Sequence, residues 1–219
     1  MAINSFEEIL AIIDDIKKIH SELKDSIDFN VEDNKHAIYI LQGGSITALN
    51  YSYKFNLSGC ILPLLQQYRM IIEIVDLILF FDEISKDARQ IKAFFKNKTV
   101  GRKPGNTGNL SYEERAKNDL LAISEVKHMD GVRKELVNLS SKFMHPTLDA
   151  IRSNLSQKTY LFDYDNLLAK KPYSDIRSFS NLFLIPVLHG LLLPINNFVL
   201  LKDNYEKLNK FLKMIRDST

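Results

Sequence analysis

The sequence has very little cysteine and no basic leader. The single Cys60 among 219 residues excludes an intramolecular disulfide and a zinc cluster of several thiolates, and it fits a reducing compartment. The segment 1–15 carries acidic residues among its apolar ones and lacks the basic start and apolar run of a signal peptide. These features predict a cytoplasmic protein.

An excess of one charge is also missing, because 29 basic and 27 acidic residues give a net charge of +2. The chain therefore lacks the overall positive charge that is typical of nucleic-acid-binding proteins. Only a local basic patch could contact a nucleic acid. One such patch is the loop at 98–109, which is rich in Gly, Pro and Asn and carries Lys98, Arg102 and Lys103. We interpret it either as a contact for phosphates or as an ordinary solvated loop.

Motifs for cofactors and metals are absent as well. Gly43-Gly44 is not a phosphate-binding loop, because neither the wider glycine pattern nor the Lys-Ser/Thr pair of such loops is present. Asp163 and Asp165 do not make a calcium loop, since no glycine turn or closing glutamate follows them. We therefore expect neither a cofactor nor a metal ion.

What the chain does have is apolar residues at helical spacing. A hydrophobic content of 45% is enough to bury a substantial core within one domain that spans residues 1–219. The glycine pair at 43–44 is expected to interrupt one of the helices, where it allows either close helix packing or a kink. The pattern predicts an all-α fold with helices at about 5–27, 37–55, 60–81, 85–97, 111–129, 132–145, 147–155, 174–201 and 203–215.

The apolar run at 181–201 is long enough to cross a bilayer. Its interior contains two prolines together with His189, Asn196 and Asn197, which argue against a membrane segment. A helix buried inside a bundle is also hydrophobic on most sides. We therefore expect a core helix here and no membrane partner.

The predicted helix at 60–81 carries three charged residues on one face. Arg69 and Glu73 are four positions apart and Asp76 follows three positions later, so their side chains project from the same side. Ion pairing within an apolar region is one interpretation, because buried charges are costly unless they are paired. The other is a polar site in which the guanidinium binds an anion.

The segment that ends at His145-Pro146 is the best lead to a reactive site. Pro146 stops the preceding helix, which leaves His145 at a helix C-terminus with Ser141 on the same face. A histidine with a pKa of about 6.5 is usable there as an acid, a base or a donor. The alternative is that this face is simply solvated, because the apolar stripe of the helix lies opposite.

Three segments in this order resemble the HEPN-like helical proteins of bacteria: Arg69-Met-Ile-Ile-Glu73-Ile-Val-Asp76, the helix at 81–94, and Leu139-Ser-Ser-Lys-Phe-Met-His145-Pro146-Thr147. The similarity covers about residues 62–152. It implies a HEPN-like helical bundle with a core at about 60–155 and additional terminal helices, the C-terminal ones at 174–217. Such bundles are often homodimers, and their catalytic branch consists of metal-independent endoribonucleases of defence or toxin systems.

The chain departs from the catalytic pattern of that family, in which an Arg is closely followed by a His. Arg133 precedes His145 by twelve positions. The resemblance then leaves a rebuilt site in which His145 takes a proton from a ribose hydroxyl and an arginine, namely Arg69, Arg133 or Arg152, stabilises the phosphate. The binding residues expected around that pair are Glu73, Asp76, Arg133, Ser141 and Arg152. RNA or a nucleotide is the expected partner, and the alternative is a noncatalytic helical binding or oligomerisation module.

Overall fold

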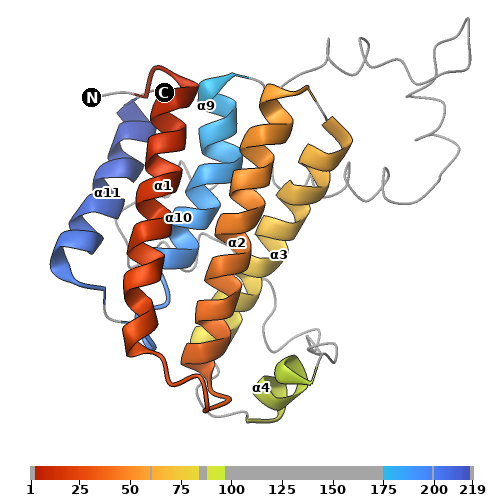
Figure 1. Ribbon diagram of the computed structural model, residues 1–219, viewed down its shortest axis with the longest axis vertical. Coiled ribbons are helices and arrows are strands. Elements are labelled where there is room, and N and C mark those ends of the chain that lie inside the picture. The colour runs from red at the N-terminus through yellow and green to blue at the C-terminus, as the bar shows by residue number, and fades with distance from the viewer. Residues whose placement is uncertain (1–2, 60, 84–87, 97–174, 199, 218–219) are drawn as a thin grey trace, which may run out of the picture.

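The computed structural model describes residues 3–59, 61–83, 88–96, 175–198 and 200–217, and every element of regular secondary structure in them is a helix. The all-α fold class is therefore confirmed for the described part of the chain. In Figure 1 the long helices run side by side along one axis, and both ends of the chain lie at the same end of the bundle. The elements are α1 (Phe6–Glu22), the 3₁₀ turn η1 (Leu23–Ser26), α2 (Asn34–Leu57), α3 (Ile61–Glu83), α4 (Ala88–Phe95), α9 (Ile176–Phe179), the π-helical turn η2 (Ser180–Leu184), α10 (Ile185–Leu192) and α11 (Lys202–Asp217).

Helix α1 begins where the sequence predicts it. Ser5 is the N-cap, and its hydroxyl accepts a hydrogen bond from the backbone N–H of Glu8 at 3.2 Å. The Glu8 carboxylate in turn accepts from the backbone N–H of Asn4 at 2.7 Å, which satisfies a second amide at the helix start. Isoleucines at helical spacing then bury one face of the helix, namely Ile9, Ile12, Ile13, Ile16 and Ile19.

The interruption predicted at Gly43 and Gly44 is absent, because α2 continues through both residues, whereas the close helix packing that the pair was also expected to allow is present. The glycines instead allow neighbouring side chains to approach closely. A Cβ atom at Gly43 would lie 3.2 Å from Cε1 of His20 on α1, and one at Gly44 would lie 3.4 Å from Ile74 on α3. The pair thus fits α2 between its two neighbours, which outweighs the cost of glycine within a helix.

The apolar run at 181–201 is a helix only as far as Leu192, so the prediction of one helix over 174–201 was wrong at its C-terminal end. Pro194 ends the helix because a proline disfavours helical geometry in the residue before it. Pro186 is tolerated because η2 lies directly before it, where the Ile185 N–H reaches back to the Ser180 carbonyl. No helix among the described residues is long and apolar enough to span a membrane.

The main hydrophobic core lies between α1, α2, α3, the helical segment 176–192 and α11. Aromatic rings occupy its centre, where Phe183 stacks on Phe179 and meets the edge of Tyr68 from α3. A second cluster joins the start of α2, the end of α3 and α4 around Ile38 and Phe81. The two clusters hold α1 and α2 side by side, which forms the surface described in the next subsection.

Asp82 connects the end of α3 to the turn that follows α10 through hydrogen bonds. Its carboxylate is buried and accepts hydrogen bonds from the side-chain amides of Asn196 and Asn197 at 2.9 and 2.8 Å. The backbone N–H groups of the same two residues lie 3.4 and 3.1 Å from the carboxylate oxygens. A buried carboxylate is tolerated only with such partners, so Asp82 is a structural residue that fixes this turn.

We expect Asp82→Ala to lower the free energy of unfolding by about 2 kcal/mol, because hydrogen bonds to a charged group are lost and buried donors remain unpaired. Urea denaturation followed by circular dichroism measures the change. Asp28→Ala is the matched control, since Asp28 is exposed and bonds only locally to Asn30. The control should change stability by less than about 0.5 kcal/mol. Equal effects of the two substitutions would contradict the role assigned to Asp82.

Candidate anion site between the first two long helices

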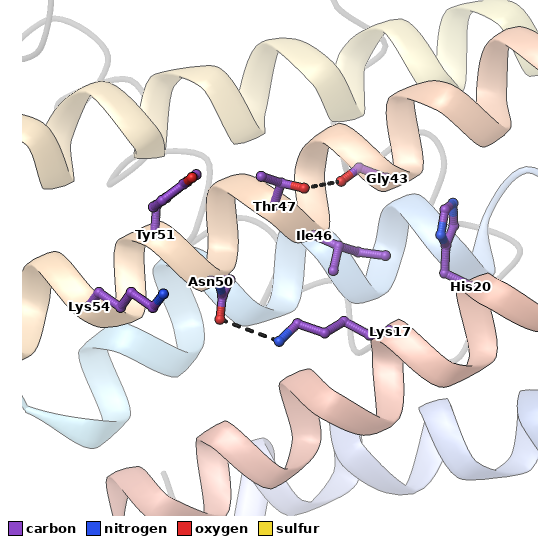
Figure 2. A pocket seen from close by; sticks show the side chains of 8 residues that line it. All are labelled: Lys17, His20, Gly43, Ile46, Thr47, Asn50, Tyr51 and Lys54. Carbon is purple, nitrogen blue, oxygen red and sulfur yellow. Dashed lines mark hydrogen bonds between the residues drawn. The ribbon is translucent and has the colours of Figure 1, made fainter.

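A groove of about 340 Å³ lies on the surface between α1 and α2. Figure 2 shows its side chains, with His20 at one end and Lys54 and Tyr51 at the other. Two residues come from α1 and the others from α2, where their spacing of three or four positions places them on one helical face. The lining residues are Lys17, His20, Gly43, Ile46, Thr47, Asn50, Tyr51 and Lys54.

Two ammonium groups point toward Asn50 in the middle of this groove, which we call the α1–α2 groove (Figure 2). The Lys17 ammonium donates to the Asn50 side-chain oxygen at 3.4 Å and to the Asp14 carboxylate at 2.8 Å. The Lys54 ammonium lies 5.9 Å from the centre of the Tyr51 ring, within the range of a cation–π contact. Positive charge is therefore held at this end of the groove by contacts to both helices.

His20 forms the other end of the groove. Its Nε2 lies 3.0 Å from the Tyr39 carbonyl oxygen, and its ring stacks on the Tyr39 ring with the centroids 4.3 Å apart. A carbonyl oxygen can only accept a hydrogen bond, so Nε2 carries the proton and donates. Burial lowers the pKa of His20 from its ordinary value, although the hydrogen bond to Tyr39 opposes that change. His20 is thus neutral near pH 7.

The groove presents mainly hydrogen-bond donors, which suit an anion. Its lining contains two ammonium groups, one amide and two hydroxyls, but no carboxylate. The hydroxyl of Thr47 donates to the Gly43 carbonyl at 2.9 Å. Among the described residues, no group of three His, Cys, Asp or Glu side chains is arranged to hold a metal ion.

The charged face predicted on α3 is present but lies at the surface. Nε of Arg69 and the carboxylate of Glu73 form an ion pair at 2.8 Å, with side chains that are 28% and 54% exposed. Asp76 is half-buried on the same helix. The spacing correctly predicted the pair of Arg69 and Glu73, whereas the expected setting inside the core is corrected to a partly solvated one.

The other predicted site residues lie outside the described residues. These are His145, Arg133, Ser141 and Arg152, together with the basic loop at 98–109. The structure therefore does not place His145 relative to Arg69, and the site predicted around these residues stays a prediction. No side chain among those that line the α1–α2 groove belongs to the predicted set.

The groove was not predicted from the sequence, although the residues that α2 contributes to it follow a recognisable pattern. Gly43, Thr47, Asn50 and Lys54 recur at helical spacing and mark one polar or small-residue face of α2. Lys17 and Asn50 are 33 positions apart, and their contact depends on the pairing of α1 with α2. Helical periodicity could therefore predict only the part of the groove that α2 contributes.

Comparison with known proteins gives no neighbour from which to transfer a family or an activity. The all-α class rests on the helices described above, and the resemblance to HEPN-like proteins rests on the sequence segments alone. No protein-family model, no curated protein and no solved structure matches this chain.

Proposed function

We propose that this protein is a noncatalytic helical binding module that holds a phosphate-bearing ligand, a nucleotide or RNA, in the α1–α2 groove. The observation that carries the proposal is the convergence of Lys17 and Lys54 on Asn50 within a concave surface that has no carboxylate in its lining. A HEPN-like bundle, a homodimer and a cytoplasmic role in bacterial stress or defence belong to the same proposal, and the sequence segments quoted above support them.

The lysine end suits a phosphate better than a carboxylate. A phosphate monoester carries a charge of about −1.5 to −2 at pH 7 and presents three acceptor oxygens. Two ammonium groups from different helices can both donate to such a group, while a carboxylate offers fewer acceptors. Asp14 already holds Lys17 at 2.8 Å, but it is a single exposed carboxylate, so a doubly charged phosphate competes with it.

Binding is favoured over cleavage for a reason found in the groove itself. His20 supplies the imidazole of the lining, and Figure 2 places its ring at the end away from Lys54. No general base therefore lies beside the expected phosphate position among the lining residues. An endoribonuclease reaction would depend on His145 and Arg69, of which only Arg69 lies among the described residues.

The double variant Lys17→Ala/Lys54→Ala tests the proposal. We expect it to weaken binding of a fluorescein-labelled RNA or of a nucleotide by about tenfold, because each of the two partly exposed ammonium groups contributes roughly 0.5–1 kcal/mol to the contact with phosphate. Fluorescence anisotropy for RNA and isothermal titration calorimetry for nucleotides measure the affinities. The two ligands separate an RNA partner from a free nucleotide.

The matched control is Lys210→Ala/Lys213→Ala, which removes the same charge from the exposed face of α11. It should leave both affinities unchanged within about twofold, since distant surface charges are largely screened at physiological salt. An equal loss in the two double variants would indicate nonspecific charge attraction. That result, or the absence of binding by the wild type, would contradict the proposed function.

A further inference from the structure

The two ends of the α1–α2 groove differ in hydrogen-bonding polarity. The end near Asn50 and Lys54 offers donors, because ammonium groups only donate. The end near Gly43 is formed by His20, whose Nε2 proton is engaged by Tyr39. Gly43 and Lys54 are separated by eleven positions of α2, which at 1.5 Å per residue is about 16 Å along the helix. A ligand that fills the groove therefore needs two chemically distinct ends.

His20 determines what the second end of the ligand must be. A neutral imidazole with its proton on Nε2 has an unprotonated Nδ1, which accepts a hydrogen bond. The lowered pKa keeps the ring in that state near neutral pH. The stacking of the ring on Tyr39 and its close approach to Gly43 hold the ring in place. The matching group on a ligand is an N–H or O–H donor and not a second phosphate.

The volume of the groove suits a small molecule. A volume of about 340 Å³ lies near the lower end of the range typical of small-molecule sites, which runs from roughly 300 to 1,000 Å³. Nucleobases present N–H groups on their edges, at a distance from the 5′-phosphate that the ribose spans. A single nucleotide thus has the acidic end, the donor end and the size that the groove requires.

Building on the proposed function, we infer that the α1–α2 groove binds one mononucleotide, with the phosphate at Lys17 and Lys54 and an N–H group of the base donated to Nδ1 of His20. The hydrogen bond between the base and His20 then gives a nucleotide a higher affinity than a sugar phosphate, which has no base. The selectivity depends on His20, while the affinity for the phosphate depends on the lysines.

Calorimetric titration with ribose 5-phosphate and with the four common nucleoside 5′-monophosphates tests this assignment. We expect at least one nucleotide to bind about two- to tenfold more tightly than ribose 5-phosphate, the gain from one hydrogen bond. His20→Phe keeps a planar ring against Tyr39 but has no acceptor nitrogen. It should abolish this advantage and leave the affinity for ribose 5-phosphate unchanged.

Gly43→Ala provides a second variant that leaves His20 in the chain, since the added Cβ would meet the imidazole at 3.2 Å and shift it by a few tenths of an ångström. It should also reduce the advantage of the nucleotide, and thermal unfolding of each variant verifies that it folds. Equal binding of ribose 5-phosphate and all nucleotides by the wild type would overturn the assignment of the base end while leaving the phosphate site intact. Loss of binding of all ligands in Lys17→Ala/Lys54→Ala, with selectivity retained in His20→Phe, would overturn it as well.

Discussion

Phe183→Ala is expected to lower the free energy of unfolding by about 4 kcal/mol, the largest effect of any substitution considered. Phe183 is 1% exposed at the centre of the core. Its ring centroid lies 4.9 Å from that of Phe179 and 5.5 Å from that of Tyr68. Truncation removes these contacts and leaves a cavity that rigid helices on several sides cannot close. Urea denaturation monitored by far-ultraviolet circular dichroism measures the loss.

Phe29→Ala is the control for this prediction, because the Phe29 side chain is 47% exposed. Its ring makes edge contacts with His36 and Tyr39 only at the surface. The same chemical change there should cost about 1 kcal/mol or less. Similar losses for Phe183→Ala and Phe29→Ala would contradict the packing of the helical segment 176–192 against α3.

Acidification is expected to remove about 3 kcal/mol of stability through His189. Burial lowers the pKa of His189 from 6.5 to about 4 in the folded protein. The unfolded chain therefore binds a proton at a higher pH than the folded protein does. The contribution of His189 is fully present above about pH 6.5, declines as the pH falls, and is lost below about pH 4.

Denaturation of the wild type and of His189→Leu between pH 4 and pH 7 isolates this contribution from the other titrating groups. As the pH falls from 7 to 4, we expect the unfolding free energy of the wild type to decrease by about 3 kcal/mol more than that of His189→Leu. Parallel pH profiles would show that His189 is accessible to protons in the folded state, contrary to its burial on α10.

Local signals predicted much of the fold. The capping box at Ser5 and the isoleucine spacing of α1 were sufficient to place that helix, because both depend on residues within a few positions of each other. The same holds for α11, whose predicted bounds of 203–215 compare with 202–217 in the structure. The all-α class follows from the same periodicity.

The errors in the predicted helices have two different causes. Gly43 and Gly44 were expected to interrupt a helix, yet the neighbours His20 and Ile74 need the space that glycine leaves. In the segment 181–201 the apolar composition was given more weight than Pro194, which nevertheless ends α10. The first error reflects tertiary packing, whereas the second gave too little weight to a local rule that holds in the structure.

The α1–α2 groove shows the same limit for function. Asn50 and Lys54 share a face of α2 that periodicity reveals, whereas Lys17 and His20 join them only after α1 packs alongside. The ion pair of Arg69 and Glu73 was predictable because its residues are four positions apart. The exposure of that pair was not predictable, because it depends on which neighbours cover α3.

The most direct measurement of the central claim is a titration of ¹⁵N-labelled protein with inorganic pyrophosphate, followed by the backbone amide resonances. A phosphate site in the α1–α2 groove predicts saturable shifts concentrated at Lys17, Asn50 and Lys54, with the resonances of α11 near Lys210 unmoved. Nonsaturable shifts spread over all exposed lysines, or saturable shifts confined to another part of the chain, would contradict it.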